Sequence, residues 1–238
     1  EAIDTNTKFY CNNKFQLGDR EFKCLGRHGT INIEKAIVES CNIFFYNLAL
    51  KTSISTINQY SRILGFGNLS GIDLPGEAKG FIPSNEWKIN KYNEPWFDGD
   101  TLNLAIGQGY LLVTPLQMNL ATMLIANEGT NYVPHIVDEI VDINKGKTVL
   151  QLAPKVLNKV SIGEWVWKVI KQAMKKVVDE GTARYGGTTA EVEIAGKTGT
   201  AQTFGNTHAW FTAFGPYDDP ELVITVMVEN SGYGASIA

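Results

Sequence analysis

The chain has 238 residues, of which 44% are hydrophobic, and its formal net charge is −4. This length and apolar content suffice for one large domain or two small ones. The mild negative charge, without a cluster of Lys and Arg, argues against a nucleic-acid groove or a polybasic membrane patch. No apolar run reaches the roughly 18 residues that a membrane span requires. Because the first residue is Glu1 rather than Met, we expect the chain to be cut from a longer protein.

The N-terminal fifth of the chain predicts a loop followed by two helices. Residues 1–31 are polar and rich in turn-forming residues, and they show little periodicity. Asn32 is a suitable N-cap for a short amphipathic helix. A second helical pattern begins after Asn42. We therefore expect residues 40–42 to lie where one helix ends and the next begins.

The middle of the chain predicts further helices and a hairpin. The clearest start signal is Thr114, an N-cap residue, followed by Pro115 at the first helical position. Residues 69–99, with several prolines, are expected to be mostly loop. Helices are expected over residues 54–65, 115–127 and 163–180, and a β-hairpin is expected over residues 133–149.

The last fifty residues have a strand-like composition, rich in Val, Ile, Thr and aromatic residues. Strands are expected over residues 191–204, 208–214 and 222–229. Their connections are short, and parallel neighbours would need a crossover of a dozen residues or more. The C-terminal part, residues 191–229, is therefore predicted to be an antiparallel meander. With the helical region before it, the fold class is α+β.

The first of these strands contains the sequence AGKTGTAQ, which includes Lys197, Thr198, Gly199 and Thr200. Lysine supplies positive charge, threonine hydroxyls donate hydrogen bonds to a carboxylate, and glycine lets a ligand approach the backbone. This combination predicts an anion-binding strand edge. The alternative is an ordinary polar edge strand with a solvated lysine.

A second motif lies upstream, where Ser40 and Asn42 flank a cysteine. A serine and an asparagine at this spacing also form common capping pairs at helix ends. Together with Lys-Thr-Gly, however, Ser-x-Asn belongs to the motif set of serine acyltransferases such as penicillin-binding proteins and serine β-lactamases.

Longer segments extend the resemblance over nearly the whole chain. AIVESCNIFFYNLA, GFGNLSGIDLPGEAKGFIPSNEWK, EPWFDGDTLNLAIGQGYLLVTPLQM and AGKTGTAQ all resemble class B penicillin-binding proteins, especially the elongation type. The resemblance implies the penicillin-binding protein/serine β-lactamase-like transpeptidase fold. It also implies a peptidoglycan D,D-transpeptidase that acts on D-Ala-D-Ala stem peptides and is acylated by β-lactams. A glycan polymerase partner and a membrane-anchored position outside the cytoplasm are implied as well.

One family motif is absent from the sequence. No serine is followed three residues later by lysine, so the nucleophile motif Ser-x-x-Lys is missing. In the family this motif and the first strands of the sheet lie upstream, and a covering helix follows the last strand. We therefore expect the motif before Glu1, and no covering helix before Ala238. The chain is interpreted as an internal portion of a transpeptidase domain rather than as an inactive homologue.

The resemblance also implies a role for each matching residue. Ser40 and Lys197 resemble the pair that relays a proton toward the leaving group, and Asn42 resembles the side chain that holds the substrate amide. Thr198 and Thr200, with Gly199 between them, resemble the residues that bind the terminal carboxylate. The backbone N–H of Thr200 would be half of the oxyanion hole.

The three cysteines, Cys11, Cys24 and Cys41, share the first 41 residues with His28. Three thiols and one imidazole suit a closed, structural zinc site. Alternatively, Cys11 and Cys24 form a disulfide in an extracytoplasmic protein, and Cys41 is a buried small side chain. The family favours zinc, because some elongation-type members hold zinc in this region with Asp, His and Cys ligands. Residues 1–42 are therefore predicted to contain a zinc-binding loop.

Other functions share the same motifs. A D,D-carboxypeptidase or a serine β-lactamase uses the same acyl-enzyme and differs in how water reaches it. A β-lactam sensor or an inactive scaffold held together by zinc is the non-enzymatic alternative.

Overall fold

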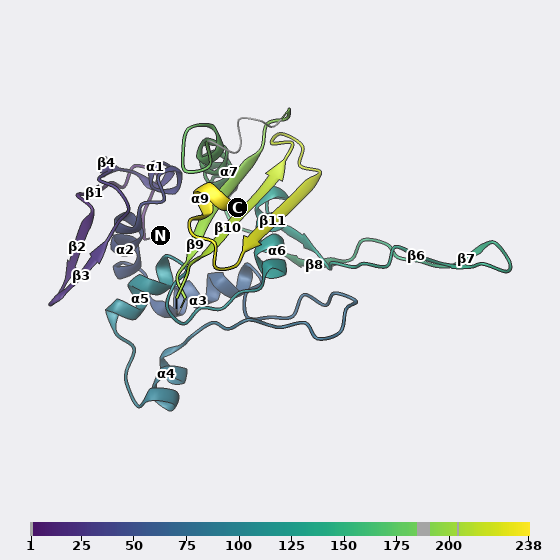
Figure 1. Cartoon of the computed structure of the whole chain (residues 1–238), viewed down its shortest axis with the longest axis horizontal. Coiled ribbons are helices and arrows are strands. Elements are labelled where there is room, and N and C mark those ends of the chain that lie inside the picture. Colours follow the sequence, from purple (N-terminus) through teal and green to yellow (C-terminus); the bar gives the residue numbers. More distant parts are fainter. Residues whose placement is uncertain (1, 185–190, 204) are drawn as a thin grey trace.

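The computed structural model describes residues 2–184, 191–203 and 205–238 (Figure 1). Its helices are α1 (Ile33–Val38), α2 (Asn42–Leu50), α3 (Ile54–Ile63), α4 (Asn85–Tyr92), α5 (Asp98–Ala105), α6 (Pro115–Ala126), α7 (Glu164–Asp179) and α9 (Gly234–Ile237). Its strands are β1 (Phe9–Cys11), β2 (Lys14–Leu17), β3 (Arg20–Lys23), β4 (Gly29–Ile31), β5 (Thr130–Tyr132), β6 (Glu139–Asp142), β7 (Lys147–Gln151), β8 (Val156–Lys159), β9 (Ala195–Ala201), β10 (His208–Gly215) and β11 (Leu222–Val228).

The largest sheet is the predicted antiparallel meander, with strand order β11-β10-β9. Lys197 on β9 lies opposite Thr212 on β10, and Gly199 lies opposite Trp210. The last residue of the first predicted strand, Phe204, lies outside the described residues. Because β10 is central, β9 is an edge strand among the strands that the structure describes, and it presents one row of backbone groups away from the sheet.

Helices α6 and α7 pack against this sheet (Figure 1). The predicted start of α6 is confirmed, because Thr114 and Gln117 form a capping box and Pro115 follows the cap. The hydroxyls of Thr122 on α6 and Thr212 on β10 are 2.7 Å apart. Apolar side chains from α6, α7 and β10 share one cluster, which includes Ala126, Met174 and Phe214.

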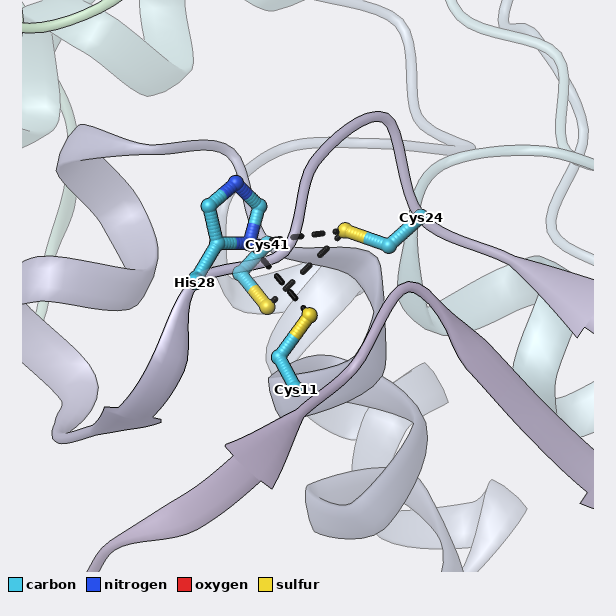
Figure 2. Close-up of side chains that lie close together, drawn as sticks. All are labelled: Cys11, Cys24, His28 and Cys41. Carbon is cyan, nitrogen blue, oxygen red and sulfur yellow. Dashed lines mark hydrogen bonds between the residues drawn. The ribbon is translucent and has the colours of Figure 1, made fainter.

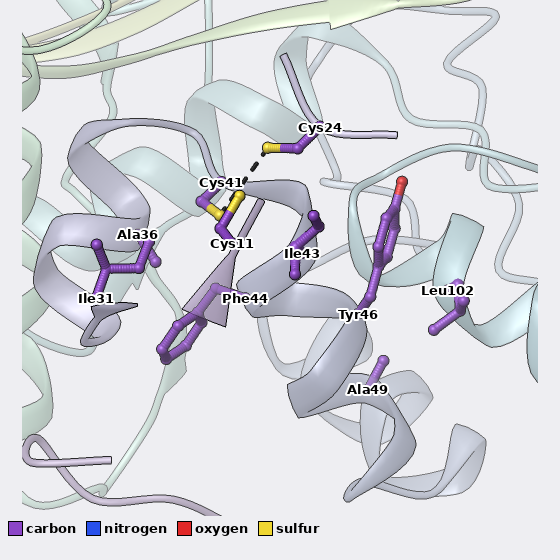
Figure 3. Packing of buried hydrophobic residues seen from close by; sticks show 10 residues of the cluster. All are labelled: Cys11, Cys24, Ile31, Ala36, Cys41, Ile43, Phe44, Tyr46, Ala49 and Leu102. Carbon is purple, nitrogen blue, oxygen red and sulfur yellow. Dashed lines mark hydrogen bonds between the residues drawn. The ribbon is translucent and has the colours of Figure 1, made fainter. Parts of the chain in front are cut away.

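The prediction that residues 1–31 are a loop is wrong. Strand β1 pairs with β4 and β2 pairs with β3, both antiparallel. The rings of Phe15 and Phe22 lie 5.7 and 5.6 Å from the ring of Tyr46 on α2. Figure 3 shows this helix with its buried side chains, including Phe44 and Tyr46, in the N-terminal core. Strands of three or four residues are too short for periodicity to reveal, and packing on α2 stabilises them.

Residues 69–99 are mostly outside helices and strands, as expected, but they contain α4 and the beginning of α5. Ser84 caps α4 by accepting a hydrogen bond from the Trp87 N–H. Lys88 is buried and forms an ion pair with Asp100 on α5, which fixes the two helices to each other. A short helix, α9, also follows the last strand, where none was expected.

The predicted hairpin is confirmed as β6 and β7, and it extends away from the rest of the molecule (Figure 1). Its apolar side chains are exposed, and Ile143 at the tip is 91% exposed. Behind it, β8 returns to pair with β5. Among the described helices, none has the length and apolar content of a membrane span.

Candidate active site

The six residues predicted to act on substrate line one cleft of about 800 Å³. They come from the α1–α2 junction and from β9, and they are Ser40, Asn42, Lys197, Thr198, Gly199 and Thr200. Residues of β3, α2, α5 and the α9 region complete its walls. The fold therefore brings together two motifs that are more than 150 residues apart in sequence.

Ser40 lies in the turn that follows α1, in a backbone conformation that glycine usually adopts. Its φ is +51°, in the left-handed region. The Cys41 N–H donates to Ala36 O at 2.9 Å and the Ser40 N–H donates to Ile37 O at 3.2 Å. These two hydrogen bonds form a Schellman motif, with serine at the position where glycine is most common. The turn directs the Ser40 hydroxyl toward β9.

Lys197 is the partner of that hydroxyl. Its Nζ donates a hydrogen bond to Ser40 Oγ and another, of 2.9 Å, to the carbonyl oxygen of Thr198. No carboxylate forms an ion pair with Lys197 among the described residues. Burial without a counter-charge lowers the pKa of Lys197 to about 8. The site thus offers a proton-exchanging lysine next to a hydroxyl.

The remaining predicted residues lie beside this pair. Asn42 is the first residue of α2, and its Nδ2 donates to Lys23 O at 3.2 Å. The hydroxyl of Thr200 accepts a hydrogen bond of 3.1 Å from the Gly234 N–H. A Cβ on Gly199 would lie 3.2 Å from the Cβ of Trp210. The absence of a side chain at Gly199 therefore relieves crowding against β10, independently of any ligand.

Among the cleft residues that the sequence did not predict, Thr182 and Gln108 form hydrogen bonds with β9. The hydroxyl of Thr182, in the turn after α7, is 2.7 Å from the hydroxyl of Thr198. Gln108 lies in the turn after α5 and contacts β9. Gln108 is part of the GQGYLLVTPLQM segment, but a lone threonine or glutamine in a turn gives no signal of a distant partner.

The predicted metal ligands form a compact cluster behind the cleft. Cys11 ends β1, Cys24 follows β3, His28 precedes β4 and Cys41 joins α1 to α2. Their ligand atoms all lie within 4.8 Å of one another. Figure 2 shows the four side chains pointing toward a common centre. All three cysteines are free, so the Cys11–Cys24 disulfide is not formed in this structure.

The spacing of the cluster fits tetrahedral zinc. Zn–S bonds of about 2.3 Å and Zn–N bonds of about 2.05 Å place sulfurs about 3.8 Å apart and sulfur about 3.6 Å from nitrogen. The Sγ atoms of Cys24 and Cys41 are 3.9 Å apart. His28 Nδ1 lies 3.4 Å from Cys11 Sγ and 3.6 Å from Cys24 Sγ. The donor set and these three separations therefore match one four-coordinate ion.

The comparisons with known proteins establish the family. The model of the "Penicillin binding protein transpeptidase domain" matches residues 1–238. The chain belongs to the penicillin-binding protein transpeptidase family. This confirms the fold class and the family that its motifs predict.

Two similar proteins carry the name of a peptidoglycan transpeptidase. The chain is 37% identical over 237 residues to "Peptidoglycan D,D-transpeptidase MrdA" of Haemophilus influenzae, covering 92% of this chain and 36% of the relative. It is 34% identical to the Escherichia coli K12 protein of the same name, covering 92% of this chain and 37% of that protein. The chain thus spans little more than a third of the length of these relatives.

Solved structures agree with this assignment. "Penicillin-Binding Protein (PBP2) from Helicobacter pylori" superimposes with a TM-score of 0.87 at 34% identity, over 99% of this chain and 43% of that one. PBP2 of Pseudomonas aeruginosa, in complex with WCK 5153, gives a TM-score of 0.85 at 34% identity, over 98% of this chain and 53% of that one.

Proposed function

We propose that this chain is the substrate-binding portion of a serine-type peptidoglycan D,D-transpeptidase that works in cell elongation and is a target of β-lactams. The observation that carries the proposal is the contact of Lys197 Nζ with Ser40 Oγ, in one cleft with Asn42 and the threonines of β9. The relatives named peptidoglycan D,D-transpeptidase MrdA support the same activity.

Each cleft residue has its own role in an acyl transfer from a D-Ala-D-Ala stem peptide. The hydroxyls of Thr198 and Thr200 bind the terminal carboxylate, or the carboxylate of a β-lactam, near the positive charge of Lys197. Asn42 holds the substrate amide. The Thr200 N–H donates to the oxygen that becomes negative in the tetrahedral intermediate. Ser40 and Lys197 pass the proton to the departing amine.

The nucleophile belongs to a Ser-x-x-Lys motif that this sequence does not contain. Its serine hydroxyl attacks the peptide carbonyl, and the lysine takes the hydroxyl proton. D-alanine leaves with a proton, and an ester to the serine remains. The amine of a second stem peptide then attacks this ester, forms the cross-link and frees the serine.

Fluorescent penicillin tests the proposal. We expect covalent labelling of the full-length protein, with a fluorescent band that survives denaturation, and no labelling of the 238-residue chain alone. Stable labelling of the isolated chain would show that the nucleophile is wrongly assigned. A full-length protein that binds no penicillin covalently would favour the inactive scaffold. Hydrolysis of the label within minutes would favour a β-lactamase.

We also propose a structural zinc ion held by Cys11, Cys24, His28 and Cys41. The support is the match between their separations and tetrahedral coordination. When bound, zinc would supply positive charge to the thiolates and would link β1, the β3–β4 turn and the α1–α2 junction. Four protein ligands leave no position for a reacting water, so its role is to support Ser40 and Asn42.

Partners and location follow from the same assignment. We propose that the protein acts outside the cytoplasmic membrane with a glycan polymerase of the elongation machinery. One structural neighbour, at 30% identity, is described as "Structural coordination of polymerization and crosslinking by a peptidoglycan synthase complex". Another is PBP2 of Helicobacter pylori in complex with MreC, at 35% identity. Co-purification of the full-length protein with a polymerase would test this pairing.

A further inference from the structure

Gln108 lies in a tight turn at the end of α5 that brings its side chain to the sheet. Its backbone N–H donates to Asn103 O at 2.9 Å, which ties the turn to the helix. Gly107 and Gly109 on either side have φ values of +73° and +76°. Glycine adopts this conformation without steric cost, so the two glycines allow the chain to reverse around a single residue.

The Gln108 side chain binds the free edge of β9. Its Nε2 donates to the carbonyl oxygen of Thr200 at 2.9 Å, and its Oε1 accepts from the Gln202 N–H at 3.3 Å. One carboxamide therefore satisfies an acceptor and a donor on this edge, as the peptide group of a neighbouring strand would. These contacts join residues 92 and 94 positions apart.

This contact lies next to the backbone N–H of Thr200 on the same edge of β9. In an extended strand, the N–H and C=O of one residue point to the same edge. The Thr198 carbonyl accepts from Lys197, and the Thr200 carbonyl accepts from Gln108. Between these two carbonyls, the Thr200 N–H points to the edge that lines the cleft.

We propose that Gln108 is a positioning residue that fixes the Thr200–Gln202 edge of β9, and so holds the Thr200 N–H in place to stabilise the developing oxyanion. Its catalytic part rests on the proposed transpeptidase function, whereas the contact with β9 does not.

Two variants of the full-length protein test the proposal. Gln108→Ala removes both hydrogen bonds. We expect the Gln202 amide to exchange hydrogen roughly tenfold faster than in the wild type, measured at single-residue resolution. We expect the second-order rate of penicillin acylation to fall roughly tenfold or more, because loss of one oxyanion donor costs about 100- to 1,000-fold.

Gln108→Glu provides a readout that a merely structural role would not change. At pH 7.5 its carboxylate accepts from Gln202 but repels the Thr200 carbonyl, so we expect slow acylation. At pH 4.5 a protonated carboxyl donates and accepts as the amide does, so we expect recovery to within about threefold of the wild type at that pH. The titratable groups that line the cleft are Glu21, Lys23, Tyr46, Lys197 and Tyr233. The wild type measured at each pH controls for them.

The outcomes separate the two proposals. Faster exchange in Gln108→Ala with unchanged acylation would overturn the positioning role. So would a ratio of Gln108→Glu to wild-type rates that does not change with pH. If the wild type itself is not acylated, the transpeptidase proposal fails, while exchange at Gln202 still decides whether Gln108 holds the strand.

Discussion

Ser40 shows how a side-chain role can outweigh a backbone preference. A non-glycine residue in the left-handed region costs about 1–2 kcal/mol, and the Schellman turn at the end of α1 requires that conformation. Glycine would adopt this conformation without strain, but it has no hydroxyl to accept the hydrogen bond from Lys197. Backbone strain of this kind concentrates at functional sites.

Ser40→Gly and Ser40→Ala should therefore separate stability from activity. Both variants lose the hydroxyl, so we expect both to slow penicillin acylation of the full-length protein by at least about tenfold. In denaturant unfolding, we expect Ser40→Gly to be about 1 kcal/mol more stable than Ser40→Ala, because glycine adopts a positive φ without cost. Equal stabilities would contradict the strain at this position.

The pKa of Lys197 gives the free energy of unfolding a defined pH dependence. Burial lowers this pKa from 10.5 to about 8, so between these values the unfolded chain binds more protons than the native protein. The burial penalty of the charged lysine is fully present below pH 8 and is lost as the pH rises through this window. Between pH 7 and 10, we expect the free energy of unfolding of the wild type to rise by up to about 3 kcal/mol relative to that of Lys197→Met. Urea unfolding at each pH measures this difference. A constant difference would argue against a buried, unpaired ammonium.

At the scale of the element, the N-terminal strands depend on what lies behind them. They are three or four residues long and bury few side chains, and isolated two-stranded hairpins are marginal in water. Aromatic contacts with α2 and the Cys–His cluster supply the missing order. This is why composition and periodicity alone predict a loop here.

Zinc removal should act on these strands and on the cleft together. We expect elemental analysis to find about one zinc per chain, and Cys41→Ser or a strong chelator to remove it. Loss of zinc should lower the thermal unfolding midpoint and slow acylation, because Cys41 lies between Ser40 and Asn42. A protein without zinc whose intact mass is two protons low would instead indicate a disulfide.

The elements that the sequence predicts correctly are those with strong local signals. Thr114 and Pro115 start α6 as expected, and short connections make the C-terminal strands antiparallel. Helix α4 also has a capping signal, Ser84, but the surrounding prolines favour a loop. Gln108 has no local signal at all, because its partners on β9 are set by the tertiary fold.

At the scale of the whole molecule, the cleft depends on how α1 and α7 meet. Glu34 on α1 and Lys176 on α7 form an ion pair across this contact. Gly181, just after α7, lies so close to α1 that a Cβ would be 2.7 Å from Val38 O and 2.8 Å from Val177 Cα. This close approach places Thr182 beside Thr198. Neither Ser-x-Asn nor Lys-Thr-Gly predicts this position of Thr182, because it results from the packing of two helices from distant parts of the chain.

Gly181→Ala should therefore push α1 and the turn after α7 apart. The added methyl meets backbone atoms that cannot move away, so we expect a destabilisation of about 2 kcal/mol and slower acylation. Gly99→Ala in α5 is the matched control, because its Cβ would make only an ordinary 3.5 Å contact with Phe22. We expect that control to be neutral or slightly stabilising. Equal unfolding midpoints for the two variants would contradict the close approach.

The β6–β7 hairpin is a site where the chain can accept an insertion. The chain enters it at Asp138 and leaves it at Leu152, whose N–H donates to Asp138 O at 2.9 Å, so the two arms meet at its base. Its apolar side chains are exposed. Figure 1 shows the hairpin extending away from the sheet of β9, β10 and β11. Exposed tips of this kind tolerate insertion. A fluorescent domain spliced between Asn144 and Lys145 would therefore report the position of the protein in a living cell, while Ser40 and Lys197 keep their contact.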